Sequence, residues 1–149
     1  QEEAHELADT GAFDVIYGAG CHCAQPIENY NGTWIIYGLG NAVTESANTA
    51  DTIVNNQGVT ARIQFAGKKG VAGSWRVNRI DWVPSANETQ GKYQWCSLAS
   101  DHPDGTCWDE TQDANVRQRI WDVLYSMGAD QNVVKEWNIT AERAGSSGE

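Results

Sequence analysis

The residues of this chain best suited to chemistry are its three histidines and four cysteines, and their densest group is Cys21-His22-Cys23. In an extended segment Cys21 and Cys23 share one face of the chain, and His22 points to the other. Zinc sites commonly place two or more residues between paired cysteines, so these three side chains are not expected to converge on an ion. We therefore predict no metal site and no cofactor.

The cysteines are instead expected to form two disulfides. An even cysteine count in an extracellular chain indicates paired cysteines, and one intervening residue would strain a bridge between Cys21 and Cys23. Each of these two residues should then join Cys96 or Cys107, in either of two connectivities. Each bridge would close a long loop and stabilise the fold by about 3–5 kcal/mol.

Two groups of polar residues could support acid–base catalysis. His102 lies in a loop with Asp101 and Asp104, and Asp109 is followed directly by Glu110. Both groups are also typical of turns and helix starts. The motifs of serine hydrolases, of zinc metalloproteases and of phosphate-binding loops are not found in the sequence. We therefore assign no catalytic residue and expect a protein that is not an enzyme, with a small secreted hydrolase as an alternative.

Three N-glycosylation sequons, which begin at Asn31, Asn87 and Asn138, indicate a secreted protein. Gln1 at the start of the chain is typical of what cleavage of a signal peptide leaves. No run of about 18 apolar residues is present, so we expect no membrane-spanning segment and no membrane partner. The predicted location is therefore extracellular. The seven tryptophans also leave open an extracellular carbohydrate-binding module, because exposed aromatic patches are commonly functional.

Charge is distributed unevenly along the chain. The net charge of −10 opposes nucleic-acid binding. Residues 57–92, however, hold six basic side chains against two acidic ones. This segment is either a solvated strand face or a contact patch for an acidic partner. The candidate patch consists of Lys68, Lys69, Arg76 and Arg79.

The pattern of apolar residues predicts an α+β protein with one domain over residues 13–143. A flexible acidic arm is expected over residues 1–12, and a disordered tail over residues 144–149. The domain should contain a mostly antiparallel sheet of about four to five strands, packed against two or three helices. Strands are expected at residues 13–17, 34–37, 59–65, 74–83 and 92–98.

One predicted strand changes the face on which its apolar residues lie. Trp75 and Val77 share one face of the strand at 74–83, whereas Ile80 and Trp82 share the other. Either a β-bulge near residues 78–79 restores the register, or the strand is packed on both faces. Pro84 is expected to end the strand.

Helices are predicted at three places. Apolar spacing indicates one helix within residues 43–54. Asp113 is expected to cap a second, which extends to Met127 and is followed by Gly128. Asp130 is expected to open a short third helix that reaches Trp137.

The segment Trp75-Arg76-Val77, followed by Asn78 and Arg79, resembles a Trp-Arg-x-Arg motif of small secreted fungal proteins, the Leptosphaeria avirulence–suppressing (LARS) effectors. The LARS resemblance implies a sheet with helices and disulfides. It also implies that the motif residues hold the fold, with Trp75 in the core and Arg76 on the other face, bound to loop carbonyls or to a carboxylate.

The same resemblance implies a function. It predicts a non-enzymatic virulence or avirulence effector from a fungus, which enters the apoplast of a plant and can later be taken up by host cells. Such a protein would act as a monomer that recognises a host protein or an immune receptor. The carbohydrate-binding module and the small hydrolase are the alternatives to this function.

Overall fold

A computed structural model describes residues 1–45, 55–101, 106–138 and 140 of the 149-residue chain. It is a single α+β domain with two sheets and, among the described residues, two helices, α1 (Glu2–Asp9) and α2 (Glu110–Leu124). The predicted fold class is therefore confirmed. The sheets are mixed rather than mostly antiparallel, because each contains a parallel pair of strands. The helix predicted within 43–54 lies mainly outside the described residues, as does the tail from Ala144.

The first sheet has the strand order β1-β3-β2 and is built from the N-terminal third of the chain. It comprises β1 (Val15–Tyr17), β2 (Ile27–Tyr30) and β3 (Thr33–Ile36). Strands β2 and β3 form an antiparallel hairpin, whereas β1 runs parallel to β3. All four residues of β3 are buried, which explains the short run of apolar residues in its sequence.

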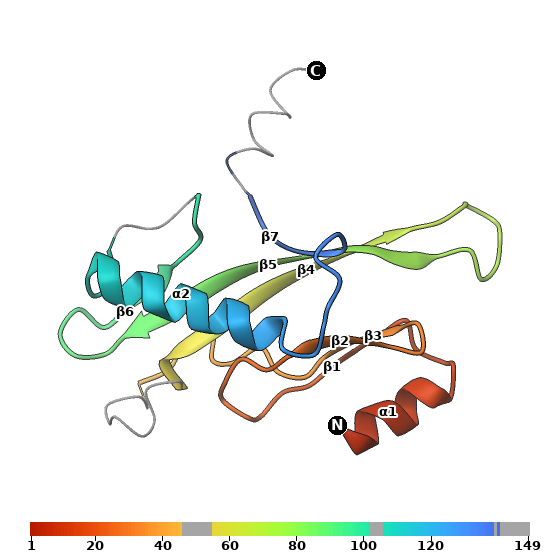
Figure 1. Ribbon diagram of the computed structural model, residues 1–149, viewed down its shortest axis with the longest axis horizontal. Coiled ribbons are helices and arrows are strands. Elements are labelled where there is room, and N and C mark those ends of the chain that lie inside the picture. The colour runs from red at the N-terminus through yellow and green to blue at the C-terminus, as the bar shows by residue number, and fades with distance from the viewer. Residues whose placement is uncertain (46–54, 102–105, 139, 141–149) are drawn as a thin grey trace.

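The second sheet has a long antiparallel hairpin at its centre, made of β4 (Gln57–Ala66) and β5 (Arg76–Glu88). Two short strands follow the other edge of β5. Strand β6 (Gln94–Ser97) pairs antiparallel near its end, and β7 (Val134–Glu136) pairs parallel near its middle. The hairpin projects from the rest of the domain at one end (Figure 1).

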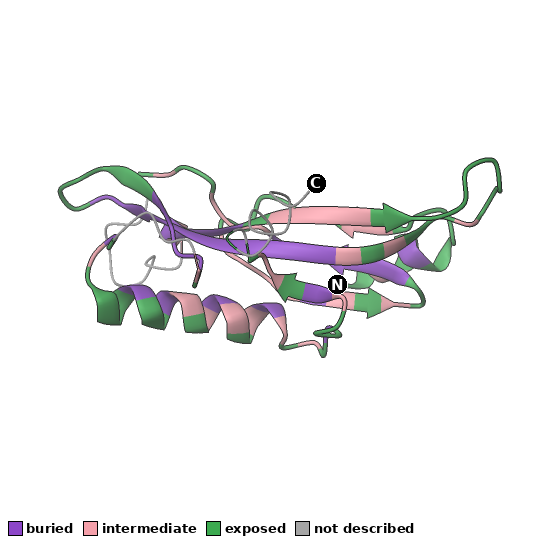
Figure 2. Cartoon of the chain, turned by 90° about the horizontal axis from the view of Figure 1, so that it is seen from above, coloured by how far each residue is buried: buried purple, intermediate pink, exposed green. Residues whose placement is uncertain are grey.

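Helix α2 lies along one face of the second sheet (Figures 1 and 2). Its side chains Val116, Ile120 and Leu124 are buried in the core that both sheets share. Burial of each such side chain contributes about 1.5–3 kcal/mol. Trp82 on β5 is fully buried in this core.

A chain of hydrogen bonds ties three elements together around Trp82. The Trp82 Nε1 donates to the Tyr125 hydroxyl, 3.1 Å away, and that hydroxyl donates to the Val134 carbonyl at 2.8 Å. The Trp121 ring meets Trp82 edge-on, with ring centroids 5.6 Å apart. The indole and the phenol therefore have partners despite their burial.

Strand β5 confirms the predicted bulge and corrects its predicted end. The pairing shifts between Gln64 and Phe65, which lie opposite Arg79 and Val77 and leave Asn78 as the extra residue.

The strand does not end at Pro84 but continues to Glu88. The Pro84 carbonyl accepts a hydrogen bond from the Leu98 N–H at 2.9 Å. The Leu98 carbonyl accepts one from Arg117 Nε at 2.8 Å. Proline has no N–H to donate to the Leu98 carbonyl, and Arg117 supplies that donor instead. The carbonyl is therefore paired although Pro84 lies opposite it.

The cysteine prediction is wrong in both the number and the pairing of bridges. Cys96 on β6 is bonded to Cys107, and their Cα atoms are 5.8 Å apart. Cys21 and Cys23 are free thiols in the loop after β1. A bridge needs Cα atoms within about 7 Å of each other. Cys96 and Cys107 meet this condition because β6 and the approach to α2 are adjacent.

Helix α2 begins one turn earlier than the sequence predicted. The N-cap of α2 is Asp109. Asp113 lies in the first turn, and its carboxylate accepts the N–H groups of Cys107, at 2.7 Å, and Trp108, at 3.2 Å. Two acids at capping spacing made the start ambiguous by one turn.

Residues 131–138 contain no helix. A turn leads into β7 instead, because Val134 is buried, Lys135 is exposed, and the Trp137 N–H donates to the Trp82 carbonyl at 2.8 Å.

The first twelve residues contain α1, which is attached to the first sheet through a polar cluster. His5 on α1 lies 2.9 Å from a Glu28 carboxylate oxygen that also accepts the Tyr37 hydroxyl, 2.6 Å away. The His5 ring stacks on Tyr30 with centroids 3.7 Å apart. The flexibility expected for residues 1–12 stays a prediction.

Candidate functional site

Two loops meet at the carboxyl ends of the parallel strands β1 and β3. Residues 18–25 follow β1, and residues 37–42 follow β3. The Gly18 N–H donates to the Ile36 carbonyl at 2.8 Å, and the Gln25 N–H donates to the Gly38 carbonyl at 2.9 Å. In sheets with parallel strands, ligands commonly bind beyond this end.

His22 is held at the tip of the first loop in a conformation unusual for a residue with a side chain. Its φ is +57°, in the left-handed region, and such residues persist only where their surroundings hold them. Its Nδ1 lies 2.9 Å from Asn41 Oδ1 on the second loop. Asn41 is fixed in turn, because its Nδ2 donates to the Asn55 carbonyl at 2.7 Å.

This network assigns the histidine tautomer. Since the Asn41 amide nitrogen is used as a donor to Asn55, its Oδ1 is the acceptor that faces His22. The neutral His22 ring therefore carries its proton on Nδ1. Nε2 is left with a lone pair that can accept a proton or a hydrogen bond from a ligand.

The two free thiols lie on either side of His22 in the chain. The Cys21 thiol donates to the Cys23 carbonyl at 3.0 Å. It approaches the second loop so closely that a Cβ on Gly38 would lie 2.6 Å from the Cys21 sulfur, so only glycine fits there. Burial raises the pKa of the Cys23 thiol, and its interactions with Cys21 raise it further. Cys23 is therefore protonated at neutral pH and a poor nucleophile.

Together the loops line a cavity of about 260 Å³. Its walls combine glycine backbone, apolar side chains, and Cys21 and His22 of the Cys-His-Cys segment. The lining residues are Tyr17, Gly18, Ala19, Gly20, Cys21, His22, Leu39, Gly40, Ala42 and Val59. Within the described part of the chain, no three His, Cys, Asp or Glu side chains are arranged to hold a metal ion.

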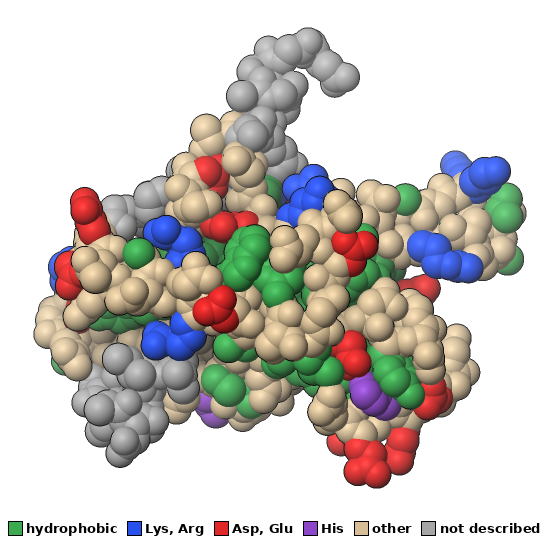
Figure 3. All heavy atoms as spheres, viewed as in Figure 1, with side chains coloured by type: hydrophobic (Ala, Val, Ile, Leu, Met, Phe, Trp, Pro, Cys, Tyr) green, Lys and Arg blue, Asp and Glu red, His purple; other side chains and the backbone are tan. Residues whose placement is uncertain are grey.

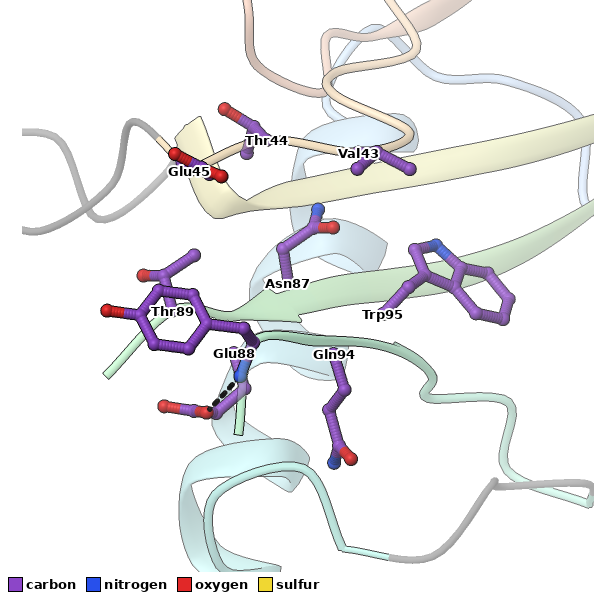
Figure 4. Close-up of a pocket in the computed structure, with 9 residues that line it drawn as sticks. Val43, Thr44, Glu45, Asn87, Glu88, Thr89, Gln94 and Trp95 are labelled. Atoms are coloured by element: carbon purple, nitrogen blue, oxygen red, sulfur yellow. Dashed lines mark hydrogen bonds between the residues drawn. The ribbon is translucent and has the colours of Figure 1, made fainter. Parts of the chain in front are cut away.

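A second, smaller hollow of about 120 Å³ lies at the far end of β5 (Figure 4). The rings of Tyr93 and Trp95 are exposed beside it. Two carboxylates, Glu45 and Glu88, line it. Glu88 accepts the N–H groups of Gln90 and Lys92 at 2.6 Å each, as well as that of Tyr93. Burial raises the pKa of Glu88, but these backbone donors outweigh burial and lower it. Glu88 therefore shapes a turn rather than facing a ligand.

The three sequon asparagines lie in different environments. Asn31 is exposed in the turn between β2 and β3 and donates to Asp9 Oδ1 at 2.9 Å. Asn138 is exposed, whereas Asn87 is buried on β5, and its side chain donates to the Asn56 carbonyl at 3.4 Å. Glycosylation at these sites stays a prediction.

The candidate catalytic groups are not brought together. His102 and Asp104 lie outside the described residues, and the Asp101 carboxylate accepts the Thr140 N–H at 2.8 Å. Asp109 caps α2. Among the described helices, none is both long and apolar enough to cross a membrane.

The predicted basic patch is divided. Lys68, Lys69 and Arg76 lie at the projecting end of the β4–β5 hairpin (Figure 3), whereas Arg79 pairs with buried Asp81. The sequence predicted Trp75 in the core, but its side chain is 48% exposed near the end of the hairpin. Trp75 precedes β5 at the projecting end of the hairpin, beyond the side chains that form the core.

Comparisons with known proteins place a likeness on the N-terminal part of the chain. A family described as bacterial capsule synthesis protein PGA_cap matches residues 1–46 of the 149. The PGA biosynthesis protein CapA of Bacillus subtilis (strain 168) is 39% identical over 80 residues, which are 52% of this chain and 19% of CapA. The chain thus spans about a fifth of that relative. No solved structure matches.

These matches correct the predicted function. A fungal effector for virulence or avirulence is wrong, because the similarity is to a bacterial capsule synthesis family and to a bacterial PGA biosynthesis protein. No comparison bears on the LARS family itself, so that resemblance, like the extracellular location and the monomeric state, stays a prediction.

Sequence reasoning noted Cys21, His22 and Cys23 but missed Asn41 and the cavity. The available signal was the position of both loops directly after apolar strands at 13–17 and 34–37. Had those strands been recognised as a parallel pair, their carboxyl ends would have met at one edge. The pairing itself could not be read from the sequence, because β2 lies between them in the chain.

Proposed function

We propose that this chain takes part in the synthesis of a bacterial capsule polymer, and that the His22 cavity is the site through which it does so. The observation that carries the proposal is one of location. All the residues that line this cavity, except Val59, fall within residues 1–46, the stretch that matches the capsule synthesis family. The hollow beside Trp95 lies mainly outside that stretch.

His22 supplies the chemistry of the proposed site. With Asn41 holding the proton on Nδ1, Nε2 can accept a hydrogen bond or a proton from a bound group. The glycine-rich walls let a ligand approach the backbone closely. Cys23 does not line the cavity, and its protonated thiol is a poor nucleophile.

A chimera tests the proposal. The segment of Bacillus subtilis CapA that corresponds to residues 1–46 is replaced by those residues, and the chimera is expressed in a strain that lacks CapA. We expect PGA production to be restored, and to fall to background in the His22→Ala chimera. Glu3→Gln, an exposed change on α1, is the matched control and should behave as the parent.

Immunoblotting separates a failure of function from a failure of folding. A parent chimera that accumulates to the level of CapA but makes no PGA would refute the proposed function. A His22→Ala chimera that makes as much PGA as the parent would leave the function and remove the site.

A further inference from the structure

The projecting end of the β4–β5 hairpin, residues 65–76, combines exposed apolar side chains with basic ones. Phe65, Val71 and Trp75 are 48%, 51% and 48% exposed. Lys68, Lys69 and Arg76 lie among them, and the sequence has no acidic residue from Gln64 to Ile80. We call residues 65–76 the hairpin tip.

The hairpin tip is a built structure rather than a loose loop. The Ser74 hydroxyl accepts the Lys68 N–H at 2.9 Å and lies 2.8 Å from the Val71 carbonyl. The Arg76 guanidinium donates to the carbonyls of Gly73, at 2.7 Å, and Trp75. These contacts fix the turn, so the exposed side chains are presented with little further loss of conformational freedom.

Trp75 is also held in place while one side of it faces solvent. A Cβ on Gly67 would lie 2.6 Å from the Trp75 ring, so the ring packs directly on the Gly67 backbone. The rest of the ring is exposed, as are Phe65 and Val71. Exposed apolar groups gathered in this way are typical of interaction surfaces.

The charges of the hairpin tip are available to a partner. Within the described part of the chain, no ion pair joins Lys68, Lys69 or Arg76 to an acidic group. The whole chain has a net charge of −10, so the tip is a cationic projection from an acidic body. Figures 1 and 3 show it extending past the remainder of the domain, with blue and green side chains at its end.

We propose that the hairpin tip docks on the surface of an anionic lipid bilayer. Apolar and aromatic side chains beside lysine and arginine are the composition of segments that lie in the headgroup region. The cations bind lipid phosphates while Trp75 and Val71 enter the apolar boundary. A soluble polyanion would need the charges but not the three exposed apolar side chains.

Projection makes this contact compatible with an acidic protein. Electrostatic repulsion between the acidic body and an anionic surface is screened over a Debye length of about 10 Å at 0.1 M salt. A tip that reaches the surface first keeps the acidic body away from it. This contact lies on the surface of the bilayer and needs no membrane-spanning helix. It is independent of the function proposed for the His22 cavity.

Vesicle sedimentation with the 149-residue chain tests the proposal. We expect binding to vesicles of phosphatidylcholine with phosphatidylglycerol, and at least about tenfold weaker binding to phosphatidylcholine alone. Lys68→Glu should weaken binding to the anionic vesicles by about fivefold or more, since each cation near such a surface contributes about 1 kcal/mol. Trp75→Ala should weaken it by about tenfold.

Matched controls separate the hairpin tip from general charge and aromatic content. Lys135→Glu changes an exposed lysine on β7, and Trp95→Ala changes an indole that is 45% exposed at the other end of the sheet. Both should bind within about twofold of the parent. Circular dichroism shows whether each variant is folded.

Three results would overturn the proposal. The first is equal binding to both kinds of vesicle. The second is binding to anionic vesicles that is weakened by Lys68→Glu but not by Trp75→Ala, and that free polyglutamate abolishes by competition. This result would assign the tip to a soluble polyanion. The third is a concentration-dependent dimer that Trp75→Ala abolishes, which would assign it to a second copy of this chain.

Discussion

The His22 imidazole and the Asn41 amide join two loops through a 2.9 Å contact between Nδ1 and Oδ1. His22 follows β1 and Asn41 follows β3, so the contact closes the carboxyl ends of the parallel pair. The same contact determines which ring nitrogen is left for a ligand.

Replacing Asn41 should therefore change the state of His22. In the parent protein, nitrogen NMR of the neutral His22 ring should show a protonated Nδ1 and an unprotonated Nε2. In Asn41→Ala the acceptor is lost, and a mixture of tautomers is expected. Asn132→Ala, whose side chain caps a distant turn, is the control. A parent ring protonated on Nε2 would show that the Asn41 amide is oriented the other way.

The disulfide prediction concerns labelling and stability. With an iodoacetamide label and no reductant, the denatured protein should take up two labels, on Cys21 and Cys23, and four labels after reduction. The double change Cys96→Ala and Cys107→Ala should lower the free energy of unfolding by about 3 kcal/mol, the chain-entropy value for a short loop. Urea unfolding measures it. The double change of Cys21 and Cys23 to Ala should cost much less, and equal losses would contradict the single bridge.

Local patterns predicted much of the fold, and tertiary contacts decided the rest. The alternation over 59–65 and the change of face before Ile80 gave strand β4 and the bulge, because both depend on period alone. Pro84 was misjudged because its tolerance depends on Arg117, which is 33 residues away in the sequence and supplies the missing donor. The Cys96–Cys107 pairing likewise depended on β6 lying beside the approach to α2, which no local pattern encodes.

Function was less accessible than the fold for the same reason. The Cys-His-Cys segment was visible in the sequence, but its chemistry is set by Asn41 and Gly38 from another loop. The Trp75 motif was visible too, yet its inferred burial failed because Trp75 lies before β5, where the hairpin projects beyond the core. The sequence identified these side chains, but it did not show which residues from other segments surround them.

The buried carboxylate of Asp81 should be important for stability. It is fully buried and accepts from Arg62 Nη2 at 2.8 Å and from Gln64 Nε2 at 2.7 Å, and it also pairs with Arg79. Asp81→Asn replaces one acceptor oxygen by an amide donor that faces other donors, and it leaves two cations without their anion. We expect a loss of about 2–4 kcal/mol in the free energy of unfolding.

Urea unfolding of Asp81→Asn at neutral pH measures this loss. Asp122→Asn on the exposed side of α2 is the control and should stay within about 0.5 kcal/mol of the parent. Arg62 also lies 3.8 Å from the centre of the Trp137 ring, so tryptophan fluorescence should report the change at the same time. An Asp81→Asn protein as stable as the parent would show that the two arginines need no anion there.

The attachment of α1 should weaken in acid. Burial raises the pKa of Glu28, but hydrogen bonds from His5 and Tyr37 outweigh it, so the pKa lies below its ordinary value of 4.5. Its stabilising contribution is therefore fully present above about pH 4.5 and is lost as the pH falls through the lower, folded value. The difference in free energy of unfolding between the parent and Glu28→Gln should be largest near neutral pH and shrink as the pH falls below 4.5. Urea titrations at several pH values, with exposed Glu6→Gln as the control, measure it, and a difference that grows in acid would contradict the ionised state assigned to Glu28.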